Sequence, residues 1–162
     1  MIHKKRAHPF LNRALLMLVV FALASLSASA QKGLIKSRVE PPPQPAFSEY
    51  KGVRLNMTAE EVRAKLGKPE LAADDQDYYV FSQTETAQIV YDAAHTVKAI
   101  SADFLAGTGA PDYKTVVGSD LQTKPDGSMY KLVLYEGLGF WVSYNRSVGA
   151  VPMVTITIQR IK

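Results

Sequence analysis

The sequence predicts an α+β fold: an antiparallel sheet of about six strands, with one or two short helices packed on one face. Three observations predict it. A well-capped helix signature stands at residues 58–67, six strand-like segments follow it with short polar breaks between them, and the helix-then-strands pattern recurs after residue 110. Antiparallel strands joined by short turns, with helices on one side, are typical of this class.

The first helix is expected to begin after Thr58 and to end at Gly67. Thr58 and Glu61 have the spacing of a capping box, in which each side chain hydrogen-bonds the other residue's backbone N–H. Gly67 supplies the left-handed residue that ends a helix, and Pro69 prevents its continuation. A helix of about two turns is unstable alone, so it must pack against the sheet.

Six segments are expected to be strands: 77–82, 86–91, 97–104, 129–136, 139–145 and 151–161. In the last one, Val154, Ile156 and Ile158 alternate with polar residues, which indicates one buried face. The fourth segment is apolar on both faces, which suggests a central strand or a ligand-facing surface.

A tandem helix–strand–strand–strand repeat is also expected, with subunits at about 49–105 and 110–162. Tyr79 has a counterpart in Tyr130, and a second helix of a turn or two would lie near residues 111–117. Self-similarity at a fixed spacing is the sequence mark of such repeats.

Residues 1–30 have the anatomy of a signal peptide. Four basic residues precede an apolar run at 14–26, and Ala28 and Ala30 fit a cleavage site before Gln31. A membrane-spanning helix needs about 20 apolar residues, so cleavage is favoured over the alternative of an uncleaved anchor. The expected location is the periplasm or outside the cell. The chain has no cysteine, so it is not expected to be a lipoprotein.

The segment 31–48 is expected to be a linker. It contains four prolines and no apolar periodicity, and such sequences adopt extended polyproline II. A semi-rigid tether is favoured over a docking peptide for a proline-binding groove. The folded domain is therefore expected to span 49–162.

Charge and cysteine content exclude several classes of function. Four of the 19 basic residues and none of the 15 acidic ones lie in the leader, so the remaining chain is formally neutral. Nucleic-acid binding, which depends on clustered positive charge, is therefore not expected. Thiol chemistry and thiolate metal sites are excluded by the lack of cysteine.

The segment 52–69 (GVRLNMTAEEVRAKLGKP) resembles the "G-x-x-x-G-M-T-x-x-E-V-x-x-x-L-G-x-P" pattern of the SmpA/OmlA group, which includes the BamE lipoprotein of outer-membrane barrel assembly. The wider fold class includes β-lactamase-inhibitor proteins, which are tandem repeats of this unit. Asn56 replaces the usual glycine, a position where asparagine tolerates a left-handed backbone. The lipidated cysteine of the barrel-assembly protein is missing. The resemblance implies a non-catalytic domain of the cell envelope.

Catalytic and metal-binding residues are not evident. His95 is interpreted as a polar turn residue rather than a general base or metal ligand. Asp74, Asp75 and Asp77 lack the glycine and distal glutamate of a calcium loop and are interpreted as a solvated acidic loop. No catalytic residue, metal site or cofactor is expected.

Aromatic residues on the strands are the candidates for binding another protein. Trp141 and Tyr144 lie on opposite faces of one strand, because side chains alternate along it. One set should pack under the helices and the other should form an exposed aromatic surface, unless both faces are buried. The candidate contact residues are Trp141, Tyr144, Tyr130 and Tyr79, with Trp141 first because tryptophan is frequent at interface hot spots.

The expected function is that of an exported, non-catalytic module that binds a protein in the bacterial cell envelope. The alternatives are a secreted enzyme inhibitor that clasps its target with the sheet, and a small-ligand carrier that uses the aromatic face. No membrane span is expected after cleavage.

Overall fold

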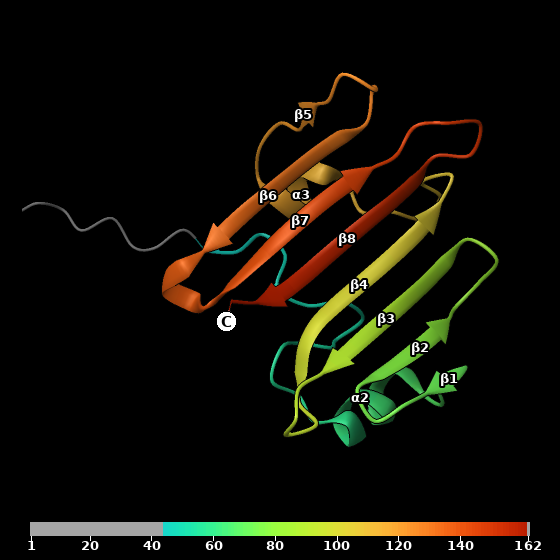
Figure 1. Ribbon diagram of the computed structural model, residues 1–162, viewed down its shortest axis with the longest axis vertical. Coiled ribbons are helices and arrows are strands. Elements are labelled where there is room, and N and C mark those ends of the chain that lie inside the picture. The colour runs from blue at the N-terminus through green and yellow to red at the C-terminus, as the bar shows by residue number, and fades with distance from the viewer. Residues whose placement is uncertain (1–43, 162) are drawn as a thin grey trace, which may run out of the picture. The chain divides into compact units, whose positions relative to one another are not determined.

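The computed structural model describes residues 44–161, which form one antiparallel sheet with two short helices (Figure 1). The predicted signal peptide (1–30) and most of the predicted linker (31–43) lie outside the described residues. The strand order is β1-β2-β3-β4-β8-β7-β6-β5. The strands are β1 Leu71–Ala72, β2 Gln76–Val80, β3 Glu85–Tyr91, β4 Val97–Leu105, β5 Gln122–Thr123, β6 Met129–Tyr135, β7 Phe140–Arg146 and β8 Met153–Arg160.

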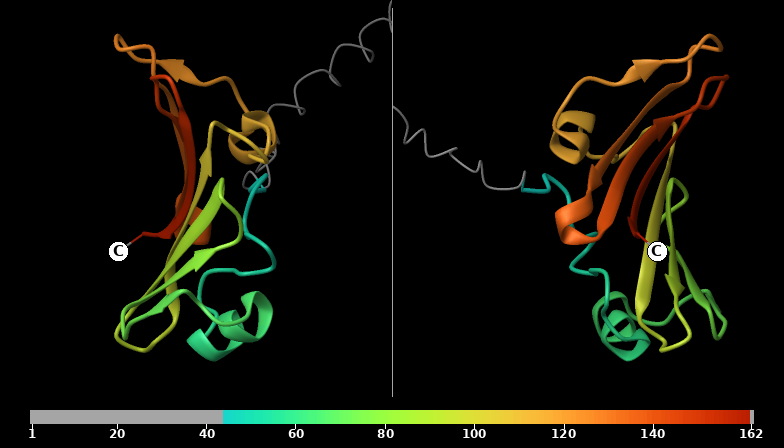
Figure 2. Two further views of the ribbon diagram at one scale, coloured as in Figure 1. Left: turned by 90° about the vertical axis from the view of Figure 1, so that its right-hand side faces the viewer. Right: turned by 60° about the vertical axis from the view of Figure 1, so that its left-hand side comes forward.

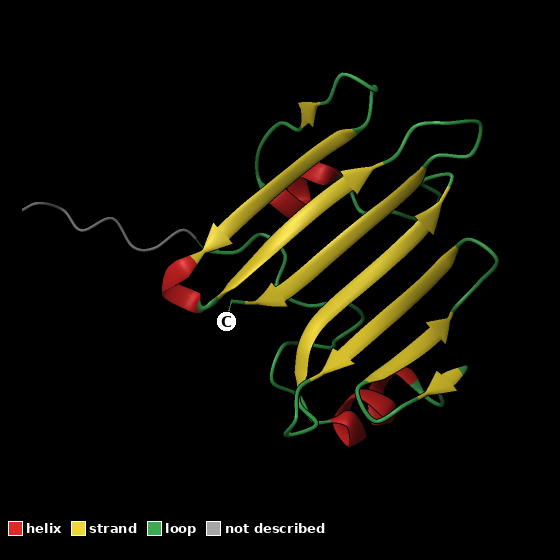
Figure 3. Ribbon diagram, in the orientation of Figure 1, coloured by secondary structure: helices red, strands yellow, loops and turns green. Residues whose placement is uncertain are grey.

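Both described α-helices, α2 (Ala59–Leu66) and α3 (Tyr113–Val117), lie on the same face of the sheet, and a 3-10 turn, η1 (Glu136–Leu138), connects β6 to β7. Figure 2 shows the two α-helices on one side, together with the chain that leads into α2. In Figure 3, α3 lies behind β6 and β7, and α2 lies at the other end of the sheet, beside β1 and β2. The predicted α+β class, an antiparallel sheet with short helices on one face, is thereby confirmed.

The number of strands is larger than predicted. The six expected segments correspond to β2, β3, β4, β6, β7 and β8, and the structure adds β1 and β5, of two residues each, outside β2 and β6. Such short strands are defined by backbone pairing and leave no apolar alternation in the sequence. Of the two alternatives for 129–136, a central strand or a ligand-facing surface, the central strand is wrong, because β6 lies next to the edge of the sheet.

Local capping chemistry fixes the ends of α2. The Thr58 hydroxyl accepts from the Glu61 N–H, and the Glu61 carboxylate accepts from the Thr58 N–H. Gly67 ends the helix with a φ of 85°, and its N–H donates to the Arg63 carbonyl. Asn56, just before the helix, has a φ of 68°, in the left-handed region. The sequence therefore places the helix start and end without help from the sheet.

The core lies between the helices and the sheet. Ala59 and Val62 of α2 and Val116 and Val117 of α3 pack with the inward-facing residues of the long strands. In β8 these are Val154, Ile156 and Ile158, all nearly inaccessible to solvent, as the alternation predicts. The opposite side of the sheet is covered by neither helix (Figure 2), and we call it the open face.

Candidate binding face

The strand register defines which residues share the open face. Directly paired residues point to the same side of a sheet, so each row of partners lies on one face. One row runs Gln76, Val90, Ala99, Gln159, Trp141 and Leu134 from β2 to β6. A second runs Gln88, Ser101, Thr157, Ser143 and Leu132, and a third Val80, Thr86, Asp103, Thr155, Asn145 and Tyr130.

An aromatic and aliphatic cluster lies at the β6–β7 end of the open face. It consists of Tyr130, Leu132 and Leu134 of β6 and Trp141 of β7, and we call it the Trp141 cluster. Trp141 is the direct cross-strand partner of Leu134. Leu132 and Leu134 are 39% and 47% exposed, respectively, so solvent reaches apolar surface here that a core would have covered.

The middle of the open face is polar, and its side chains bond to one another. The Thr155 hydroxyl donates to the Asp103 carboxylate at 2.6 Å, and the hydroxyls of Ser101 and Thr157 lie 3.3 Å apart. The open face is therefore a polar surface bordered on one side by the Trp141 cluster. Protein-binding patches in general combine an apolar contact area with adjoining polar groups.

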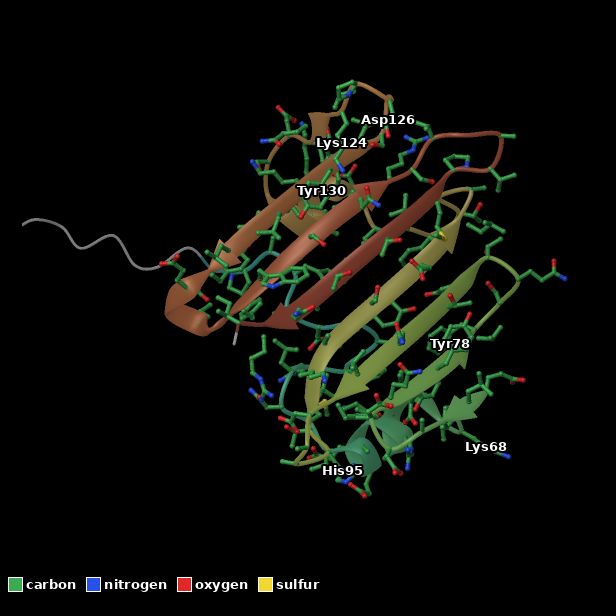
Figure 4. All side chains as sticks on the ribbon, viewed as in Figure 1. Lys68, Tyr78, His95, Lys124, Asp126 and Tyr130 are labelled. Atoms are coloured by element: carbon green, nitrogen blue, oxygen red, sulfur yellow. The ribbon has the colours of Figure 1, made fainter. Side chains whose placement is uncertain are left out.

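Figure 4 labels Tyr130 and Tyr78, which lie on β6 and β2 toward opposite ends of the sheet. The ammonium of Lys124, which directly follows β5, lies 5.0 Å from the centre of the Tyr130 ring and makes a cation–π contact with it. Lys124 thus places a positive charge beside the Trp141 cluster.

The structure separates the four predicted contact residues into two pairs. Trp141 and Tyr130 lie on the open face, whereas Tyr144 and Tyr79 are buried beneath the helices, 7% and 2% exposed. Tyr144 packs edge-on against Tyr113 of α3, with ring centres 6.2 Å apart. The inclusion of Tyr144 and Tyr79 in a binding surface is therefore corrected: in this fold they are core residues.

The leucines of the cluster were missed by reasoning from sequence. The available signal was that 129–136 is apolar on both faces of the strand. Only one face can pack under the helices, so the apolar residues of the other face, among them Leu132 and Leu134, are left uncovered. This pattern predicts either a central strand or a ligand-facing surface; the strand is not central, and the structure places both leucines, exposed, on the open face.

A buried polar network joins α2 to the sheet on the other face. Asp77 is completely buried, and its carboxylate accepts two hydrogen bonds from the Arg63 guanidinium, at 2.8 and 2.9 Å. It also accepts from the Tyr91 hydroxyl at 2.8 Å and from Tyr79 at 3.4 Å. Burial, followed by the charge of Asp77, raises the pKa of Tyr79 to about 12. Every buried polar side-chain atom of this network has a hydrogen-bond partner, as expected of a network that stabilises the fold.

The acidic segment that included Asp77 is therefore not a solvated loop throughout. Asp74 and Asp75 are exposed, but Asp77 points inward to Arg63. His95 is exposed in the β3–β4 turn with a φ of 55°. Among residues 44–161 no three His, Cys, Asp or Glu side chains come together as a metal site would require.

A second ion pair fastens the β3–β4 turn to the end of β8. Arg160 donates to the Asp92 carboxylate at 2.5 Å and to the Asn56 side-chain oxygen at 2.9 Å. Asp92 also accepts from the backbone and hydroxyl of Thr96. The hydrogen bond from Arg160, followed by those from Thr96, holds the pKa of Asp92 well below its ordinary value.

A hollow of about 500 Å³ lies near the start of β7. It is lined by Ser48, Arg54, Leu55, Asn56, Leu138, Gly139, Phe140, Arg160 and Ile161. Its two arginines are already paired, Arg54 with Glu49 and Arg160 with Asp92. The hollow therefore offers neither an enclosed apolar cavity nor a free charge for a small ligand.

Comparison with known proteins adds little. No family model and no curated protein matches the chain. Among solved structures it is similar to a DUF4309 family protein, YjgB, from Bacillus subtilis, at 16% identity over 73% of this chain and 86% of that one, with a TM-score of 0.44. The resemblance to the SmpA/OmlA group stays a prediction. Within residues 44–161, no helix combines the length and the apolar character that crossing a bilayer demands.

Proposed function

We propose that this protein is an exported, non-catalytic module of the bacterial cell envelope that binds another protein on the open face of its sheet, with the Trp141 cluster at the centre of contact. The observation that carries the proposal is the uncovered apolar surface of Leu132 and Leu134 beside Trp141, on a face that neither described helix covers. Export is supported by the leader-like composition of residues 1–30.

The chemistry of the open face supports binding rather than catalysis. Apart from one carboxylate, the polar groups of the three rows are hydroxyls and amides. That carboxylate, of Asp103, accepts a hydrogen bond from the Thr155 hydroxyl. A reaction at neutral pH needs a group poised to take up or release a proton, or an activated nucleophile. Aromatic and aliphatic side chains surrounded by paired polar groups supply contact area and specificity instead.

We also infer that the domain consists of two copies of one helix-plus-strands unit. The order of elements supports this, since α2 is followed by β1–β4 and α3 by β5–β8. The strand order supports it too: the two sets run inward from the two edges and meet where β4 pairs with β8. The Trp141 cluster then belongs to the second copy, and the corresponding edge of the first copy carries no tryptophan.

The experiment is site-specific photocrosslinking in the producing cells. A photoreactive amino acid replaces Leu132, at the edge of the cluster, and in a matched control it replaces Leu71, which is exposed on β1 at the other end of the sheet. We expect one discrete envelope protein crosslinked from position 132 and not from 71, and its loss when Trp141→Ala is added.

Equal crosslinking from both positions, or no product from either, would overturn the proposal. If the captured protein is an enzyme whose activity falls on addition of the purified protein, the interaction is inhibitory, as in the inhibitor branch of the fold class that the sequence resembles.

A further inference from the structure

The outer edge of β6 is largely unpaired. β5 pairs only with Met129 and Tyr130, which leaves residues 131–135 without a neighbouring strand on that side within the part of the chain that the structure describes. At the opposite edge of the sheet, β2 is better covered: β1 pairs with Asp77 and Tyr78, and Ala73 donates to the Gln76 carbonyl. Open edges of this kind readily accept another strand.

The backbone groups of Leu132 and Leu134 point to this open edge. Along an antiparallel strand the N–H and C=O of successive residues point to alternate sides. The Ser128 carbonyl accepts a hydrogen bond from the Lys124 N–H across the β5–β6 hairpin, so the backbone of Ser128 points to the β5 side. The even-numbered residues of β6 point to the same side. Each of the two leucines therefore presents an outward donor and acceptor.

The hydrogen bonds on the β7 side of β6 lead to the same assignment of backbone directions. Ile161 donates to the Gly139 carbonyl, so the backbone of residue 139 points to β8, and that of Phe140, Val142 and Tyr144 points to β6. Their partners on β6 are the odd-numbered residues, among them Val133. The even-numbered residues of β6 are left for the outer edge.

We propose that this edge pairs with the same edge of a second copy of the chain, in antiparallel orientation about a twofold axis at Val133. The open window 131–135 is symmetric about Val133, so the pairing uses its full length. Leu132 of one copy then faces Leu134 of the other, and Lys131 faces Tyr135. Two copies related in this way form an isologous contact, which closes at the dimer.

Charge and side-chain pattern fit a second copy as the occupant. No two like charges come opposite each other in this register, because Lys131 is the only charged residue of the window. The chain beyond residue 30 carries equal numbers of acidic and basic residues, so net charge does not oppose self-association. The facing leucines are cross-strand apolar pairs, which stabilise antiparallel ladders.

The twofold axis stands perpendicular to the sheet, so the dimer is one continuous sheet whose two open faces look in the same direction. The two Trp141 clusters lie on either side of the new junction, because Leu132 and Leu134 belong to both the edge and the cluster. The proposal rests on backbone direction and edge pairing. In the photocrosslinking experiment, a product between position 132 and a second copy of the chain would report this edge, whereas a product with a different protein would report the proposed envelope partner.

The first test measures the molar mass of the purified full-length protein by sedimentation equilibrium over a range of concentrations. We expect a monomer–dimer equilibrium that Leu134→Lys weakens at least tenfold. The matched control is Leu105→Lys, an exposed leucine on the same face but on the central strand β4, which should leave the equilibrium unchanged. A wild-type protein that is monomeric at its highest soluble concentration, or a dimer indifferent to Leu134→Lys, overturns the proposal.

The second test uses the lack of cysteine in the chain. Val133→Cys places one thiol on each copy at the axis, where a non-hydrogen-bonded antiparallel pair brings Cβ atoms to about 4.5–5.5 Å. Mild oxidation should give a covalent dimer rapidly, whereas Val80→Cys, on β2 at the far end of the sheet, should give little. Equal rates of covalent dimer formation from both variants, or no covalent dimer of Val133→Cys, contradict a self-paired edge.

Discussion

The guanidinium of Arg63, on α2, forms two hydrogen bonds with the fully buried carboxylate of Asp77, on β2, at 2.8 and 2.9 Å. The two residues are 14 apart in the chain, and their contact is the polar link between the first helix and the sheet. A buried carboxylate is tolerated only when it is paired and hydrogen-bonded, and here Arg63 supplies the compensating charge while Tyr91 and Tyr79 supply hydroxyls.

Removing Arg63 should therefore destabilise the fold. We expect Arg63→Met to lower the free energy of unfolding by about 3 kcal/mol, at the lower end of the range for broken buried pairs because the guanidinium is partly exposed. Adding Asp77→Asn should restore part of this loss, since no charge then stays buried. Urea unfolding at pH 7 measures both, with Lys65→Met on the same helix as a near-neutral control. If instead the double variant loses the sum of the losses of the two single variants, Arg63 does not act by compensating the charge of Asp77.

The Asp92–Arg160 pair should make the free energy of unfolding depend on pH in the acid range. The folded pKa of Asp92 lies below its unfolded value, so the stabilisation is complete above about pH 4 and is lost as pH falls through the folded pKa. Asp92→Asn lacks this contribution at every pH. The difference in unfolding free energy between wild type and Asp92→Asn should therefore narrow between pH 7 and pH 3, measured by urea unfolding. A difference that stays constant over this range would exclude titration of Asp92 as its source.

Replacing Tyr144 and replacing Trp141 should lower the free energy of unfolding by different amounts. Tyr144→Ala leaves a cavity beneath α3, next to Tyr113, and should lower the free energy of unfolding by about 3–4 kcal/mol. Trp141→Ala, on the open face, should cost no more than about 1–2 kcal/mol. Thermal unfolding followed by far-ultraviolet circular dichroism measures both. Equal losses would mean that Trp141 is part of the core and that the open face is covered in solution.

Much of the fold could be predicted because its signals are local. The chemistry at Thr58 and Gly67 is contained within ten residues of sequence, and the alternation in β8 needs only its own strand. The two-residue strands carry no such signal. Alternation in β7 also separates Trp141 from Tyr144, but it does not say which of them lies beneath α3, because that depends on where a helix from elsewhere in the chain packs. The same holds for Arg63 and Asp77, whose contact requires the helix and the sheet to be assembled.

The distribution of aromatic residues between the two faces has a practical consequence. All five buried tyrosines lie in the helix-covered core, while the single tryptophan stands on the open face. Excitation of the indole alone therefore reports on that surface, whereas five of the eight tyrosines report on the interior. One unlabelled sample can thus distinguish occupation of the open face, through the indole, from loss of the fold, through a tyrosine signal that comes mainly from the core.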